Sequence, residues 1–138
     1  MSMTLAILKP DCVKRKLIGE VISFIEKEGF RIVCLRMIHL QPQEAAEFYS
    51  IHRGKDYFEG LMNFMTSGPS VLMVLERENA VEHFRKVIGA TDPKKAAEGT
   101  LRRKYAENVR YNVVHGSDSD ENAKKEIAFF FSTMEIIK

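Results

Sequence analysis

The sequence predicts an α+β protein, a sandwich in which helices pack on one face of a four-stranded antiparallel sheet. Apolar residues recur at strand spacing in four runs and at helical spacing between those runs. The segments follow in the order β-α-β-(α-α)-β-α-β-α, a split βαβ pattern that is typical of the ferredoxin-like fold. A chain of 138 residues can bury one sizeable core. We therefore expect a single domain over residues 1–138.

Each of the four apolar runs has its own expected place in the sheet. Residues 4–8 form a first, central strand. Residues 31–40 carry apolar groups on both faces, so we expect that strand to be covered on both sides, in part by another subunit. Residues 70–76 are almost continuously apolar, which is typical of a central strand. Residues 109–114 are expected to form the last strand.

Helical spacing of apolar residues connects these strands. The predicted helices occupy residues 17–28, 43–50, 57–65, 79–88, 100–105 and 119–131. Gly29 and Gly89 follow two of them, as expected for a glycine that ends a helix. Residues 132–138 are expected to form a loosely packed tail.

Composition excludes several functional classes. The net charge is +2, from 21 Lys and Arg against 19 Asp and Glu, which is too balanced to indicate a nucleic-acid-binding protein. Cys12 and Cys34 form no CxxC pair and fit a reduced, cytoplasmic protein. No apolar run reaches the length of a membrane span. Neither GxxxxGK[ST] nor GxGxxG occurs, so a bound nucleotide would need another kind of site.

Residues 112–119, Asn-Val-Val-His-Gly-Ser-Asp-Ser, organise the rest of the chain. The pattern predicts a strand end, a tight turn at Gly116 and a helix start among residues that favour N-cap positions. His115 would then lie at a strand–helix junction. A histidine there could be a nucleophile, a general base or a structural residue that hydrogen-bonds the turn, and spacing leaves these alternatives open.

Several residues far apart in the sequence are candidates for an anion site. They are Lys9, Arg85, Thr91, Arg102, Asn112 and His115. Phosphoryl transfer needs cations on the phosphate oxygens, an in-line nucleophile and Mg²⁺, and arginine forks suit phosphate. Taken singly, each basic residue is better explained as a solvated surface charge than as a phosphate ligand.

Combined in this order, the motifs resemble the nucleoside diphosphate kinase family, in its short, bacterial type. The resemblance runs from about residue 4 to residue 131. The segments that carry it are Thr-Leu-Ala-Ile-Leu-Lys-Pro-Asp at 4–11, Phe-Tyr at 48–49 with Phe58, Ser-Gly-Pro at 67–69, Gly-Ala-Thr at 89–91, Gly-Thr-Leu-Arg at 99–102, and the signature at 112–119.

The resemblance implies a role for each matching residue. His115 resembles the family's phosphorylated nucleophile. Matches to its phosphate ligands are Lys9, Arg85 and Arg102, with Thr91 and Tyr49 beside them. The family's activity is Mg²⁺-dependent, ping-pong transfer of a γ-phosphate from ATP or another nucleoside triphosphate to a nucleoside diphosphate, with broad base specificity.

The remaining matches concern the sugar, the base and the support of the ring. Asn112 matches the residue that holds the sugar hydroxyl. Tyr57 and Val109 match the residues that cover the two faces of the base. Ser117 and Glu126 match the pair behind the catalytic ring, where a carboxylate that accepts the far N–H would fix the tautomer.

The resemblance also implies partners and a setting. We expect Mg²⁺ to be held by nucleotide phosphates and water rather than by protein ligands, and Asp118 could hold a metal-bound water. Family members form hexamers or tetramers built from dimers, so we expect a homo-oligomer, in the cytoplasm, without nucleic-acid or membrane partners. The alternative is a nucleotide-binding regulatory or scaffold protein of the same fold without significant turnover.

The chain departs from the family pattern at Cys12, Asp56, Arg77, Asp92 and Arg103-Lys104. None of these changes touches the matched nucleophile or phosphate ligands. The last pair reverses charge near the expected nucleotide mouth, which could shift affinity or its salt dependence.

Overall fold

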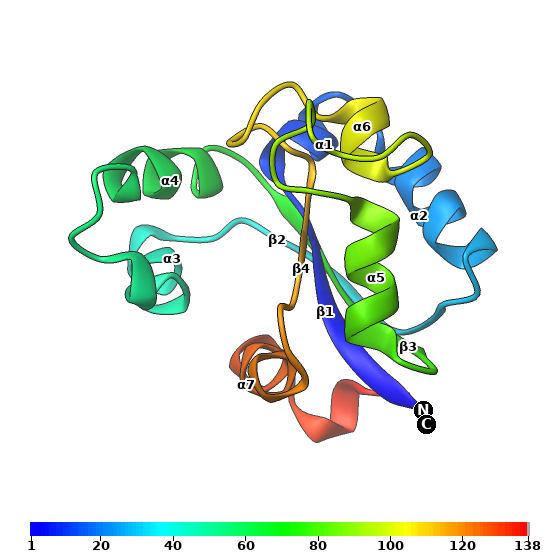
Figure 1. Ribbon diagram of the computed structural model, residues 1–138. Helices are drawn as coiled ribbons and strands as arrows, with labels where there is room; N and C mark the ends of the chain where they lie inside the picture. Colours follow the sequence, from blue (N-terminus) through cyan, green and yellow to red (C-terminus); the bar gives the residue numbers. More distant parts are fainter. Residues whose placement is uncertain (138) are drawn as a thin grey trace.

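Residues 1–137, the part of the chain that the computed structural model describes, form a four-stranded antiparallel sheet with helices against it (Figure 1). The strands are β1 (Ser2–Leu8), β2 (Arg31–Ile38), β3 (Ser70–Arg77) and β4 (Val114–Gly116). Their order across the sheet is β2-β3-β1-β4, so β1 and β3 are central, as predicted. This α+β architecture confirms the predicted fold class.

The helices follow the predicted spacing closely. They are α1 (Pro10–Lys14), α2 (Ile18–Lys27), α3 (Pro42–Phe48), α4 (Phe58–Met65), α5 (Ala80–Ile88), α6 (Leu101–Tyr105) and α7 (Asp120–Phe130), with 3₁₀ turns η1 (Ser50–His52) and η2 (Thr133–Glu135). Gly29 and Gly89 lie just past α2 and α5 with φ of 88° and 86°, the left-handed geometry that favours glycine. The short helix α1 was not predicted; Pro10 starts it at a position where proline is favoured.

Helices cover both faces of the sheet, so the prediction of a single covered face is wrong. Helices α1, α2, α5 and α6 pack on one face, where they meet Ala6 and Leu8 of β1. Helices α3, α4 and α7 pack on the other face, against Leu5 and Ile7 (Figure 1). The alternation of side chains along β1 places its apolar residues in both cores, which explains why this strand is apolar throughout.

The last strand is much shorter than predicted, because the backbone bends at Val113. Val113 has φ of 65°, which is rare for a β-branched residue, and the Val114 N–H donates to the Asn112 carbonyl at 2.8 Å. This is a γ-turn, held by an Asp11 carboxylate oxygen 3.1 Å from the Val113 nitrogen. The expected strand over residues 109–114 is therefore wrong. His115 lies inside β4, opposite Ile7, rather than at a junction.

Gly116 allows close packing and does not form the predicted tight turn. It also lies in β4, and an added Cβ would stand 2.8 Å from Cδ2 of Phe84 and 3.2 Å from Cδ1 of Ile88. The missing side chain therefore lets β4 approach α5 closely. The helix start that was predicted beyond Gly116 is made by Ser119, whose hydroxyl accepts from the Asn122 N–H at 3.0 Å.

Strand β2 is an edge of the sheet, and this chain does not supply the predicted cover on both sides. Leu35 and Met37 remain 55% and 54% exposed. The C-terminal tail lies beside this strand, since the Ile137 N–H donates to the Val33 carbonyl at 2.9 Å; Lys138 lies outside the described residues. Within residues 1–137, none of the helices combines the length and apolar character that a membrane span requires.

Candidate active site

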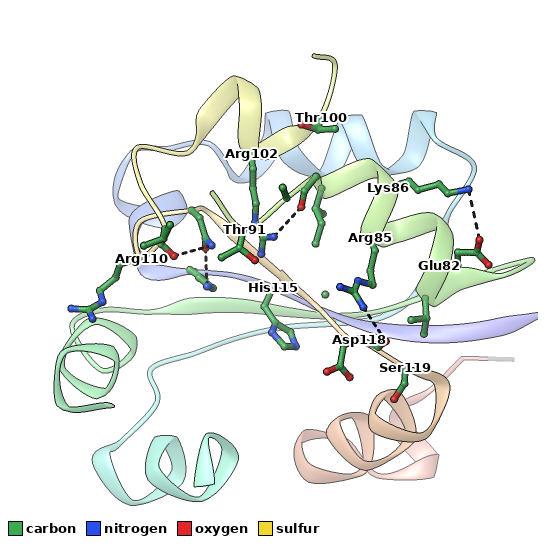
Figure 2. A pocket seen from close by; sticks show the side chains of 18 of the residues that line it. Glu82, Arg85, Lys86, Thr91, Thr100, Arg102, Arg110, His115, Asp118 and Ser119 are labelled. Carbon is green, nitrogen blue, oxygen red and sulfur yellow. Dashed lines mark hydrogen bonds and ion pairs between the residues drawn. The ribbon is translucent and has the colours of Figure 1, made fainter. Parts of the chain in front are cut away.

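One cavity of about 1290 Å³ gathers residues that are far apart in the sequence. Every candidate for the anion site lines it: Lys9, Arg85, Thr91, Arg102, Asn112 and His115. They come from the end of β1, from α5 and α6, from β4 and from the loops between them (Figure 2). Tyr49, Tyr57, Val109 and Asp118 also line the cavity, whereas Ser117 and Glu126 lie outside its lining, behind the histidine. The structure therefore brings together the residues that the sequence singled out.

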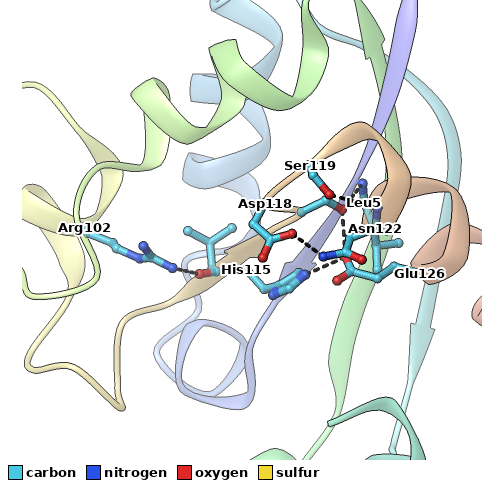
Figure 3. A network of polar contacts seen from close by, with 9 residues as sticks. Leu5, Arg102, His115, Asp118, Ser119, Asn122 and Glu126 are labelled. Atoms are coloured by element: carbon cyan, nitrogen blue, oxygen red, sulfur yellow. Dashed lines mark hydrogen bonds and ion pairs between the residues drawn. The ribbon is translucent and has the colours of Figure 1, made fainter. Parts of the chain in front are cut away.

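The imidazole of His115 is fixed from behind by α7. Its Nε2 lies 2.9 Å from Oε1 of Glu126, and the hydroxyl of Ser117 donates to the same oxygen at 2.7 Å (Figure 3). The Ser117 hydroxyl in turn accepts from the Leu5 N–H at 3.2 Å. An ionised carboxylate can only accept, so Nε2 carries the ring proton and Nδ1 keeps its lone pair. A ring in this tautomer would present Nδ1 as a nucleophilic atom.

Lys9 is one of the two buried cations of the site; 9% of its surface is exposed, the same fraction as for Arg102. Its Nζ donates to Oδ1 of Asn112 at 2.8 Å. Burial, together with repulsion from Arg102, lowers the pKa of Lys9 to about 8, and attraction from Asp11 only partly opposes this. An anion in the cavity would raise the pKa of Lys9 again, because it would supply a counter-charge to the amine.

Arg102 is held in place by backbone carbonyls. Its Nη1 donates to the Gly89 carbonyl at 3.0 Å. Its Nη2 donates to the Val114 carbonyl at 2.8 Å (Figure 3). Burial and the nearby charge of Arg85 lower its pKa to about 10, so it stays charged near neutral pH. Its Nε has no hydrogen-bond partner within residues 1–137. The guanidinium is therefore oriented before any ligand arrives.

Arg85 and Tyr49 are two further hydrogen-bond donors in the lining of the cavity. Arg85 donates from Nη1 to the Asp118 carbonyl at 3.1 Å (Figure 2). The hydroxyl of Tyr49 is buried at the cavity wall and has no partner among the described residues. Burial, with a smaller contribution from Glu126, raises the pKa of Tyr49, so this hydroxyl remains a donor.

Two large apolar side chains line one end of the cavity. Within residues 1–137, Tyr57 and Val109 are the exposed large apolar side chains that line it, at 44% and 58% exposure. The Tyr57 hydroxyl is held at 2.6 Å from Nδ1 of His52. A flat molecule such as a nucleobase could lie against these two side chains.

Sequence reasoning missed several residues of the lining. They are His52, Glu82, Lys86 and Arg110. A polar residue on a helix or loop carries no sequence signal of its own when only the tertiary fold turns it toward the cavity. Arg103, which was expected near the mouth, is not part of the lining; it donates to the carbonyls of Lys94 and Ala96 instead.

The donor set fits a cation that is carried mainly by phosphate. No group of three or more metal-ligating side chains occurs within residues 1–137. Asp118 lines the cavity, and one of its oxygens accepts from Nδ2 of Asn122 at 2.6 Å, which leaves the other free. Mg²⁺ keeps several waters and typically needs one or two carboxylates beside phosphate oxygens. A single carboxylate of this kind fits that requirement.

An α+β sandwich with a cationic cavity around the oriented His115 suits a phosphotransferase. A family model described as nucleoside diphosphate kinase matches residues 2–136. The chain is 56% identical to the nucleoside diphosphate kinase of Chlorobium chlorochromatii, over 100% of this chain and 99% of that protein. It is 50% identical to that of Chlamydia felis, over 99% and 97%.

Solved structures agree with these relatives. The Aquifex aeolicus nucleoside diphosphate kinase superimposes with a TM-score of 0.95 at 40% identity, covering 99% of both chains. That of Halobacterium salinarum, in complex with CDP, gives 0.96 at 37% identity, covering 99% of this chain and 91% of that one. The chain belongs to the nucleoside diphosphate kinase family. It is a nucleotide-binding transferase with nucleoside-diphosphate kinase activity, which confirms the family and the activity expected from the sequence.

Proposed function

We propose that the kinase reaction runs through a phosphohistidine at Nδ1 of His115. The observation that carries this proposal is the Nε2–Glu126 contact of 2.9 Å, which fixes the proton on Nε2 and leaves Nδ1 nucleophilic. In the first half-reaction, Nδ1 attacks the γ-phosphorus of a nucleoside triphosphate. The bond to the bridging oxygen breaks, and the diphosphate leaves with the electron pair.

The second half-reaction reverses the first one with another nucleotide. A terminal oxygen of the incoming diphosphate attacks the phosphorus, the P–N bond breaks, and its electron pair returns to Nδ1. One cavity serves both halves, which makes the mechanism ping-pong. Lys9, Arg85 and Arg102 supply positive charge to the phosphate oxygens, and Thr91 and the free hydroxyl of Tyr49 donate hydrogen bonds to them.

We propose Mg²⁺ as the cofactor, bound mainly by the nucleotide. Asp118 would hold it through a water molecule, since one carboxylate oxygen is free. When bound, the ion neutralises charge on the phosphate oxygens.

The sugar and base are proposed to occupy the rest of the cavity. Asn112, which is fixed between Lys9 and the Val109 carbonyl, would hold a sugar hydroxyl. Stacking between Tyr57 and Val109 tolerates every base, because each base has a π face. The CDP complex of the Halobacterium salinarum relative supports nucleotide binding by this chain.

We further propose a cytoplasmic, homo-oligomeric, single-domain enzyme, a hexamer or tetramer built from dimers. The exposed Leu35 and Met37 on the edge strand β2 support self-association, since such an edge is normally paired or covered. The free cysteines Cys12 and Cys34 fit a reducing compartment.

A labelling experiment tests the reaction. Protein incubated with γ-labelled ATP and Mg²⁺ should form an acid-labile phosphoenzyme that added GDP discharges. The His115→Ala variant should take up no label, whereas His39→Ala, whose ring contacts the Thr66 carbonyl outside the cavity, should be labelled normally. Undiminished labelling of His115→Ala would overturn the proposal.

A further inference from the structure

Arg110 lines the cavity at its apolar end, and the reaction proposed above assigns it no role. Figure 2 shows it far from Arg85 and Lys86, with its guanidinium directed toward α4. Its Nη2 lies 3.4 Å from the carbonyl oxygen of Tyr57, and its neighbour in sequence is Val109. Arg110 therefore lies next to both residues between which the base is proposed to stack, through the backbone of Tyr57 and through its own bond to Val109.

The loop that carries Arg110 is braced from within. The side chain of Asn108 accepts from the N–H groups of both Arg110 and Tyr111, at 2.9 and 2.8 Å. The ring of Tyr111 packs edge-on against Phe64, with centroids 4.9 Å apart. These contacts fix the backbone from which the arginine extends, so its side chain starts from a defined position.

Gly60 of α4 provides the space for the guanidinium. A Cβ at this position would stand 2.2 Å from Nη1 of Arg110, so the arginine lies directly over the glycine. The carbonyl of Tyr57 occupies one of the five N–H donors of the guanidinium, and within residues 1–137 no further hydrogen bond of this side chain is present. Most of its donors are thus free to reach a ligand.

The free N–H donors of the guanidinium lie beside the place where a base would stack. Such donors favour a base whose edge carries two adjacent hydrogen-bond acceptors. Guanine and hypoxanthine present O6 and N7, the pair that arginine binds in bidentate fashion. Adenine presents N7 next to an amino group, which would face the guanidinium donor to donor. We propose that Arg110 reads the base and gives the enzyme a preference for 6-oxopurine nucleotides over adenine nucleotides. This inference rests on the proposed function, and it adds a bias to stacking that otherwise accepts every base.

The test measures discharge of the phosphoenzyme, which separates the acceptor from the donor. Phosphoenzyme is first prepared from each protein and then mixed with GDP, IDP, 7-deaza-GDP or ADP in a rapid-quench instrument. For wild type, GDP and IDP should react about 5-fold faster than ADP at subsaturating concentration, and 7-deaza-GDP, which lacks N7, should react more slowly than GDP.

Variants show whether Arg110 causes the preference. In both Arg110→Ala and Arg110→Lys, the GDP-to-ADP ratio should fall about 5-fold, because lysine keeps the charge but lacks the planar fork. The ratio should be retained in Arg53→Ala, which removes an exposed arginine outside the cavity lining. Tyr57→Leu should slow all acceptors together, since it weakens stacking for every base.

The outcomes distinguish this inference from the proposed reaction. A wild-type ratio near one, or a ratio that Arg110→Ala leaves unchanged, would overturn the role of Arg110 while the phosphoenzyme still forms. Failure of wild type to form any phosphoenzyme would instead contradict the reaction itself.

Discussion

At the scale of single residues, the reactivity proposed for His115 depends on the position of one proton. Glu126 accepts from Nε2 and is itself oriented by Ser117, which a backbone N–H of β1 holds in place. The chain of contacts runs from the central strand to the ring, so the ring is presented in one tautomer and one orientation. Lys9 and Arg102 also line the cavity, and both are buried although no salt bridge within residues 1–137 pairs either of them with a carboxylate.

Glu126→Gln tests the tautomer. A glutamine can turn its amide N–H toward Nε2, which would favour the proton on Nδ1 and remove the nucleophile. We expect kcat to fall by about 100-fold or more, with little change in thermal stability. The matched control is Glu121→Gln on the same helix, where the exposed carboxylate pairs with Lys125, and it should keep full activity. A Glu126→Gln enzyme with normal kcat would contradict this role.

Lys9 should make nucleotide affinity depend on pH. Its pKa is lowered to about 8, so the amine is charged below that pH and neutral above it. Only the charged form attracts phosphate. Affinity for a nucleoside diphosphate should therefore be constant from pH 7 to about 8 and then weaken by up to about tenfold per pH unit.

Calorimetric titrations at constant ionic strength measure this profile. The terminal phosphate is already ionised throughout this range, so its own titration does not interfere. Lys9→Arg keeps its charge and should flatten the profile whatever its absolute affinity. If the affinity of the wild-type enzyme for the nucleotide stayed constant up to pH 9.5, the result would contradict a lowered pKa of Lys9.

At the scale of elements, the site depends on how closely β4 approaches α5. Gly116 lies against Phe84 and Ile88, and two residues proposed to act in the reaction are adjacent in sequence: His115 precedes Gly116 in β4, and Arg85 follows Phe84 in α5. In the Gly116→Ala variant, a Cβ 2.8 Å from a buried phenyl ring would force the two elements apart. We expect a loss of about 1–3 kcal/mol in the free energy of unfolding and a lower kcat.

Gly19→Ala is the matched control in chemical denaturation. Nothing lies within 4 Å of a Cβ at Gly19 in α2, so the alanine should be neutral or stabilise the protein by about 0.4–1 kcal/mol. A second variant that combines Gly116→Ala with Phe84→Leu should recover part of the lost activity. If Gly116→Ala proves as stable and active as wild type, the close approach of β4 to α5 does not matter for the site.

The elements also show where sequence patterns succeed and fail. Periodicity located α2, α4, α5 and β3 within one or two residues, since each buries a regular stripe or run. It failed at Val113, because the γ-turn there depends on a hydrogen bond to Asp11, about a hundred residues away in the chain. Glu126 could be proposed from the sequence because a family motif and a chemical need both pointed to it. Arg110 had neither, and only the tertiary fold places it beside Tyr57.

At the scale of the whole molecule, the two edge strands of the sheet, β2 and β4, differ in length. The short strand β4 carries the site, whereas β2 exposes Leu35 and Met37. Self-association through β2 would bury these side chains and leave the cavity open, because neither residue lines it.

Leu35→Lys tests this assembly. A lysine on an edge strand opposes strand pairing and apolar burial. We expect sedimentation of the variant at low micromolar concentration to show species at most half the mass of the wild-type assembly. Ile51→Lys, at a side chain that is 79% exposed away from the sheet, should keep the wild-type mass. An assembly of unchanged mass in Leu35→Lys would exclude β2 from the interface.

The most direct test of the account identifies the phosphorylated atom. Phosphoenzyme prepared with ATP and Mg²⁺ can be examined by ³¹P NMR, which distinguishes the two ring nitrogens, and by mass spectrometry of alkaline digests, which locates the residue. We predict a single phosphoramidate on Nδ1 of His115, because Glu126 occupies Nε2. Phosphate on Nε2, or on any other residue while His115 stays unmodified, would contradict the mechanism.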